Sequence, residues 1–143
     1  MNFNELLKDD SIKTYKPADG QISNLLSSAE GDIQTANDLL DLGRYGHSRD
    51  TAYEAMLKSG MALMFSFGFR PTSGSHHLTI VKFVKQVLGS DYEEIITAFN
   101  RLRRTRNDRL YRGKETGTKS QAAQAITNAR NLHDLISKQI AKR

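Results

Sequence analysis

The residues best suited to chemistry are six arginines that lie within fourteen positions, 99–112. On a helical wheel of about 100° per residue, Arg106 falls inside an apolar stripe made by Phe99, Leu102 and Leu110. A guanidinium on a buried stripe needs an anion, an acceptor or a partner chain, because an unpaired buried charge is very costly. Arg106 is therefore the first candidate for a functional cation.

The residue after Arg106 is Asn107, whose amide adds a hydrogen-bond donor. A guanidinium beside an amide suits a phosphate, because arginine can donate two parallel hydrogen bonds to it. Arg103 and Arg109 extend the same basic segment and are candidate binding residues. In the alternative interpretation, Arg106 pairs with a buried carboxylate, such as Asp32 or Glu54, and only holds two helices together.

Tyr111 is the third candidate for a catalytic role in this segment. In a regular helix it lies about 140° around the axis from Arg106, so the two side chains cannot face one point within one subunit. They converge if the helix unwinds near Leu110, or if two subunits pair about a two-fold axis and share the site.

Two adjacent histidines, His76 and His77, precede an apolar segment. They point about 100° apart on a helix, and no cysteine or third histidine follows at a metal spacing, so we expect no zinc site. One of them could serve acid–base chemistry or contact an anion at a helix start. The alternative is a capping or partly buried histidine with no functional role.

The composition bounds the class of protein. The chain has 143 residues, no cysteine, two prolines and a net charge of +5, and its pI is near 9.6. The length predicts one domain, and the lack of cysteine suits a cytoplasmic protein without disulfides or thiol chemistry. No apolar run reaches the roughly 20 residues of a membrane span.

The positive charge favours an anionic partner such as RNA, a nucleotide or an acidic protein, or it serves solubility alone. The segment 113–117 lacks the glycine spacing of a phosphate loop, so no cofactor is expected.

Apolar residues recur with a helical period along most of the chain, and no segment alternates as a strand does. The pattern predicts helices over 19–42, 48–67, 76–88, 92–112 and 120–138, with Asp19 and Ser48 as caps of the first two. Short connections favour antiparallel neighbours. We therefore expect an all-α, up-and-down bundle of about five helices over residues 19–143, preceded by a short appendage at 1–18 that holds a small helix near 4–8.

In these features the chain resembles the HEPN domain family (higher eukaryotes and prokaryotes nucleotide-binding). The alanine-containing segment 52–63 is similar to the second helix of the family, and Gly68, Pro71 and the histidine pair follow in the family's order. HEPN ribonucleases carry an arginine, often with a polar residue after it, and then a histidine after a gap of four to six residues. Here Arg106 and Asn107 match the first half, and Tyr111 stands where the histidine is expected.

The resemblance implies a module that binds RNA, a nucleotide or a nucleotidyltransferase partner through the face at 103–111. It also implies a homodimer that works in the cytoplasm without cleaving RNA. The rival is a metal-independent ribonuclease of a toxin–antitoxin pair, in which Arg106 and Asn107 hold the phosphate and Tyr111 or His76 assists. Tyrosine, with a pKa of roughly 10, is a poor general base at neutral pH. The tyrosine therefore favours binding over cleavage.

Overall fold

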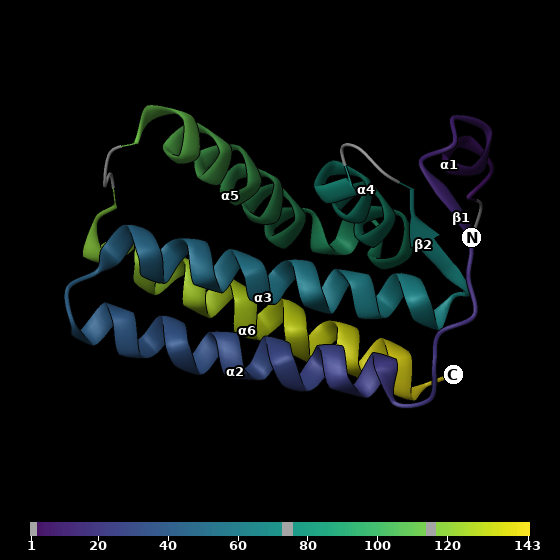
Figure 1. The fold of residues 1–143 in the computed structure, drawn as a ribbon, viewed down its shortest axis with the longest axis horizontal. Helices are drawn as coiled ribbons and strands as arrows, with labels where there is room; N and C mark the ends of the chain where they lie inside the picture. The colour runs from purple at the N-terminus through teal and green to yellow at the C-terminus, as the bar shows by residue number, and fades with distance from the viewer. Residues whose placement is uncertain (1–2, 73–75, 114–116) are drawn as a thin grey trace.

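Three long helices form the centre of the molecule in this computed structural model. They are α2 (Gln21–Asp41), α3 (Tyr45–Ser66) and α6 (Lys119–Ala141), and α2 runs antiparallel to α3 (Figure 1). The structure describes residues 3–72, 76–113 and 117–143, and for residues 111 and 112 it describes the backbone alone.

Two further helices lie on the side of α3 that faces away from α2 (Figure 1). They are α4 (His76–Leu88) and α5 (Glu93–Arg112), joined through a 3-10 turn, η1 (Ser90–Tyr92). α5 crosses over α3 and also contacts α6. This layer matters for function because it carries the arginines and both histidines of the 76–77 pair.

The predicted all-α bundle is confirmed, and the inward face of α6 is the one that the spacing of its apolar residues predicts. On α6 the buried residues are Ala122, Ala125, Ile126, Ala129, Leu132 and Ile136. α3 is buried on nearly all sides, as expected of a central helix whose second half is apolar around its circumference. Its small residues allow close helix packing, and Gly60 lies directly against Ile80 of α4.

The expectation of no strand is wrong at two short segments. β1 (Ile12–Thr14) pairs antiparallel with β2 (Phe69–Pro71), with Lys13 opposite Arg70. The chain before β1 contains α1 (Asn4–Lys8), as predicted, and it packs on the bundle through buried Leu6. Phe3 stacks on Phe83 of α4 with ring centroids 4.6 Å apart. Residues 3–14 are thus attached to the α4 side of the molecule.

Both predicted helix caps are also wrong. α2 starts after Gly20, which adopts a left-handed conformation, so Asp19 is not the capping residue. α3 starts three residues earlier than predicted, at Tyr45. Ser48 is instead buried inside the helix, where its hydroxyl donates a 2.7 Å hydrogen bond to the carbonyl of Ala36 on α2. It joins two helices where a cap was expected.

None of the helices in the described part of the chain combines the length and the apolar character that a membrane crossing requires.

Candidate functional site at the seam between α3 and α5

The second half of α5 faces α3 through two ion pairs, one helical turn apart. Nε of Arg106 lies 3.2 Å from Oε1 of Glu54, and Nε of Arg109 lies 2.7 Å from Oδ2 of Asp50. Of the two carboxylates that the sequence offered to Arg106, Glu54 is therefore the partner. The other, Asp32, pairs with Lys58 at 2.8 Å.

The expectation that Arg106 is buried on an apolar stripe is only partly correct. Phe99 is fully buried, but Leu110 is 63% exposed and the Arg106 side chain is 27% exposed. The apolar stripe thus meets the core only in the first half of α5. Beyond Leu102 the helix is held to α3 by charged groups, which water and ligands can reach.

A tyrosine and a histidine lie beside this charged seam. The hydroxyl of Tyr53 on α3 is 3.1 Å from Nδ1 of His77, at the start of α4. Tyr53 is fully buried, and its ring packs against Phe99. Residues of three helices, α3, α4 and α5, therefore meet at this point.

The burial of its ring and the arginines of α5 both affect the pKa of His77. Burial, with the charges of His76, Arg106 and Arg103, lowers the pKa of His77 to about 4. Burial also raises the pKa of the Tyr53 hydroxyl above its usual range, although the same two arginines act in the opposite direction. At neutral pH both groups are uncharged, and of the two only the partly exposed imidazole can hydrogen-bond a ligand.

The other predicted site residues are placed as follows. His76 is exposed, and its ring meets that of His77 edge to face with centroids 4.5 Å apart. Arg103 donates from Nε to Oδ1 of Asn100 at 2.9 Å, and Asn107 is partly buried. Tyr111 belongs to the last turn of α5, and its side chain lies outside the described part of the structure.

A second charged group continues the seam toward the start of α3. Asp50 accepts from Arg109 and also lies 3.9 Å from Nε of Arg49, whose side chain is almost fully buried. Nη2 of Arg109 lies 3.1 Å from Nδ1 of His47. Asp50 therefore stands between two guanidinium groups, which keeps the end of α5 in place.

The sequence did not single out Asp50 or Tyr53, and it offered Glu54 only as one of two partners. The sequence does contain a pattern that could have identified these residues. Polar residues at 49–50 and 53–54 recur one turn apart in the first half of a helix whose second half is apolar around its circumference. Such residues must find partners on a neighbouring helix, because a buried polar group without one is costly.

We found no group of three or more histidine or acidic residues in the described segments that could hold a metal ion. The groups at the seam are guanidinium, carboxylate, imidazole and phenol. The arginines can bind an anion, and the imidazole of His77 is a neutral hydrogen-bonding group beside them.

Comparisons with known proteins agree with this architecture. The family model for the HEPN domain matches residues 22–140, and the chain belongs to this family. A solved structure of similar fold is that of TT1696 from Thermus thermophilus, which is 19% identical in sequence. Its TM-score is 0.62, and the match covers 83% of this chain and 98% of that one. None of the curated proteins matches the chain.

Proposed function

We propose that this protein is a HEPN module that binds RNA or a nucleotide through the basic face of α5 and does not cleave it. The basic face consists of Arg103, Arg106, Asn107 and Arg109. The observation that carries the proposal is that Arg106 and Arg109 lie one turn apart on the second half of α5, with the imidazole of His77 nearby. Burial and the nearby cations lower the pKa of His77 to about 4, so its imidazole is a weak base at neutral pH. The site thus has cations and hydrogen-bonding groups for a phosphate, but its histidine is poorly matched to proton transfer.

The rival function, a metal-independent ribonuclease, draws support from the same histidine. Arg103 and Arg106 act on His77 electrostatically, so an imidazole does stand near the candidate phosphate-binding cations. A bound phosphate would offset those charges and raise the pKa of His77 toward the range useful for catalysis. Tyr111 or His76 would then assist.

One experiment separates the two functions. The purified full-length protein is incubated with tRNA and with mRNA in the presence of EDTA, beside Arg106→Gln and a control, Arg101→Gln. Arg101 is exposed on the same helix and is not part of the basic face. Binding that weakens with salt and with Arg106→Gln, without cleavage, is the expected result.

If the wild type cleaves RNA and either Arg106→Gln or His77→Gln abolishes the cleavage, the protein is a ribonuclease and the proposal is wrong. Equal RNA affinity of Arg106→Gln and Arg101→Gln would contradict the placement of the site under either function.

We further propose that the module works as a homodimer and docks a nucleotidyltransferase partner. What supports the proposal is membership of the HEPN family, and the exposed Leu110 beside the basic face is the position at which a contact is tested. Light scattering of wild type and Leu110→Ser tests the dimer. A monomer at micromolar concentration would contradict it.

A further inference from the structure

The two halves of α5 are attached to the molecule in different ways. In the first half, residues 93–102, the large apolar residues are buried or pack against the core: Ile95, Ile96, Phe99 and Leu102. In the second half, residues 103–110, the only large apolar residue is Leu110, and it is 63% exposed. Burial of apolar area therefore stabilises chiefly the first half.

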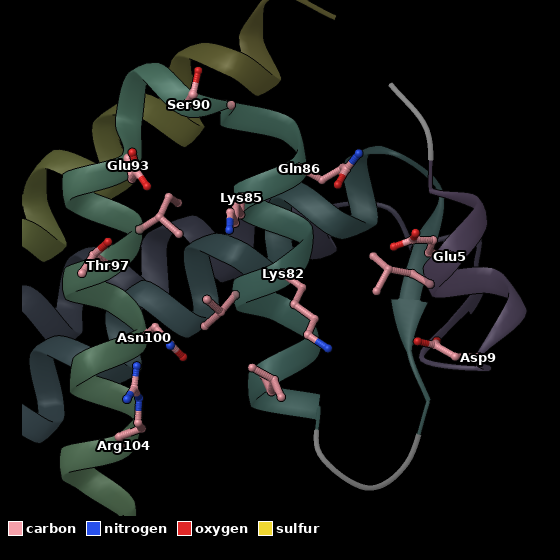
Figure 2. Close-up of a pocket in the computed structure, with 15 residues that line it drawn as sticks. Glu5, Asp9, Lys82, Lys85, Gln86, Ser90, Glu93, Thr97, Asn100 and Arg104 are labelled. Carbon is pink, nitrogen blue, oxygen red and sulfur yellow. The ribbon is translucent and has the colours of Figure 1, made fainter.

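The contact of α5 with α4 follows the same division. A groove of about 890 Å³ lies between the two helices, and Figure 2 shows the residues that line it. On α5 they run from Glu93 to Arg104, and Ile96 and Val81 of α4 are buried at this groove. In the described part of the chain, no residue of α5 beyond Arg104 lines it. The groove thus ends where the second half of α5 begins.

The second half of α5 is held to α3 by charged and polar groups. Nε of Arg106 lies 3.2 Å from Oε1 of Glu54, and Nε of Arg109 lies 2.7 Å from Oδ2 of Asp50. Nη2 of Arg109 also lies 3.1 Å from Nδ1 of His47. Within the segments that the structure describes, these are the side-chain hydrogen bonds and ion pairs that connect the second half of α5 to other helices.

Contacts of this kind hold a short helical segment weakly. Partly exposed ion pairs contribute little to stability and are screened by salt. A helix shorter than about 12 residues is marginal in water without packing. Asp50 also lies 3.9 Å from Nε of Arg49, so its carboxylate keeps a cation when Arg109 leaves. The second half of α5 can therefore leave α3 without exposing the core or leaving Asp50 beside no cation.

We propose that the second half of α5 is a switch segment with a closed and an open state. In the closed state, Arg106 and Arg109 lie on the carboxylates of α3. In the open state, the segment has detached from α3 and lost helical order, and both guanidiniums bind RNA phosphates in place of Glu54 and Asp50. The detachment does not depend on the proposed function, and only the role of the open state in RNA binding rests on it.

Hydrogen–deuterium exchange of the full chain, measured by mass spectrometry, tests the detachment. The double variant Arg106→Gln/Arg109→Gln is expected to speed amide exchange in the second half of α5 about tenfold, because both ion pairs are lost. Exchange in the first half should stay within about twofold of wild type, since its apolar contacts remain. Glutamine and arginine have similar helix propensities, so the difference reports the ion pairs and not the helix itself.

The double variant Arg101→Gln/Arg104→Gln is the matched control. Both residues are exposed on α5, and neither lies at ion-pair distance from a carboxylate among the described residues. This variant removes the same charge and should leave exchange in both halves within about twofold of wild type. An equal effect of the two double variants would overturn the switch segment, and so would faster exchange throughout α3 and α6 in Arg106→Gln/Arg109→Gln.

A charge-retaining variant checks that charge is what holds the segment. Arg106→Lys/Arg109→Lys keeps both cations, so exchange in the second half of α5 should stay within about threefold of wild type. Exchange as fast as in the glutamine variant would show that the charges do not hold the segment on α3.

A crosslink tests the role of the open state in RNA binding. Because the chain has no cysteine, Asp50→Cys/Arg109→Cys can be joined specifically by a short bismaleimide, which holds the segment on α3. RNA affinity should fall at least about tenfold relative to the same variant capped with a monofunctional maleimide. Equal affinity would overturn opening as a step of RNA binding. The exchange experiment contains no RNA, so it decides on the detachment even if the wild type binds no RNA and the proposed function is wrong.

Discussion

The hydroxyl of Tyr53 lies 3.1 Å from Nδ1 of His77, and this contact joins the middle of α3 to the first turn of α4. Because Tyr53 is fully buried, its hydroxyl needs a hydrogen-bond partner, and the imidazole of His77 is that partner. A neutral imidazole accepts at Nδ1 when the tyrosine donates, but a protonated one can only donate. The protonation of His77 is therefore tied to the packing of the two helices.

The first prediction is a loss of stability as the pH falls. The pKa of His77 is about 4 in the folded protein and near 6.5 when unfolded, so between these values the unfolded chain binds more protons. The stabilisation is complete above pH 6.5 and decreases as the pH falls toward 4. Between pH 7.5 and 5.5, urea unfolding should show a decrease of about 1 kcal/mol, after allowance for partial solvation of the ring.

Two variants control for other titrating groups in that measurement. His77→Gln should remove this part of the pH dependence, whereas His76→Gln, at the exposed neighbour, should retain it. An equal pH dependence in wild type and His77→Gln would refute the low pKa.

The second prediction concerns the pKa of His77 when an anion is bound. The positive charges of Arg103 and Arg106 contribute to its low value, and a phosphate placed between them would offset that effect. An NMR titration of the His77 ring should thus give a higher pKa with saturating RNA than without it. The same titration in Arg106→Gln should show a smaller rise. If RNA binds and the pKa of His77 stays at its starting value, the phosphate does not lie at the basic face.

The third prediction is that Glu54→Gln strengthens RNA binding. Glu54 competes with a phosphate for Arg106, and both side chains are partly exposed, so the ion pair contributes less than about 1 kcal/mol to stability. Its loss should leave folding nearly unchanged and raise RNA affinity several-fold in a filter-binding assay. Glu30→Gln is the matched control, because it makes the same charge change at the ion pair with Arg130 on the α2–α6 side. Equal gains in the two variants would indicate a net-charge effect alone.

Most of the helices could be predicted because each has its own apolar stripe, and this stripe depends only on nearby residues. The buried residues of α6 are those expected from the spacing of Ala122 to Ile136. The strands could not be predicted in this way. β1 and β2 have three residues each and are more than fifty residues apart, so neither has a local pattern that shows its partner.

The contacts of the candidate site, like the strands, could be predicted only in part from local sequence patterns. Because arginine is charged, the sequence predicted that Arg106 lies beside an anion or a carboxylate, and Glu54 is its partner. The choice between Glu54 and Asp32 depends on how α5 is rotated and tilted against α3 and α2, and no stripe specifies this. The contact between Tyr53 and His77 likewise depends on where α4 starts relative to α3.

The fourth prediction tests the close packing of α3 against α4, which positions His77 over Tyr53. A Cβ atom at Gly60 would come within 2.5 Å of Cγ2 of Ile80 and 3.1 Å of Cγ2 of Val84. Ile80 is 1% exposed and branched at Cβ, so it has little room to move aside. Gly60→Ala should therefore lower the free energy of unfolding by about 1–3 kcal/mol through overpacking, despite the better helix propensity of alanine.

Gly31 gives the matched control for this substitution. It also lies inside a long helix, α2, but a Cβ atom there would meet nothing within 4 Å. Gly31→Ala should raise the free energy of unfolding by about 0.5–1 kcal/mol, because alanine is the better helix former and the site has room for it. Urea unfolding of the two variants should thus give changes of opposite sign. Stabilisation by both would show that α4 is not packed closely on Gly60, and that Tyr53 and His77 are not held together by this helix crossing.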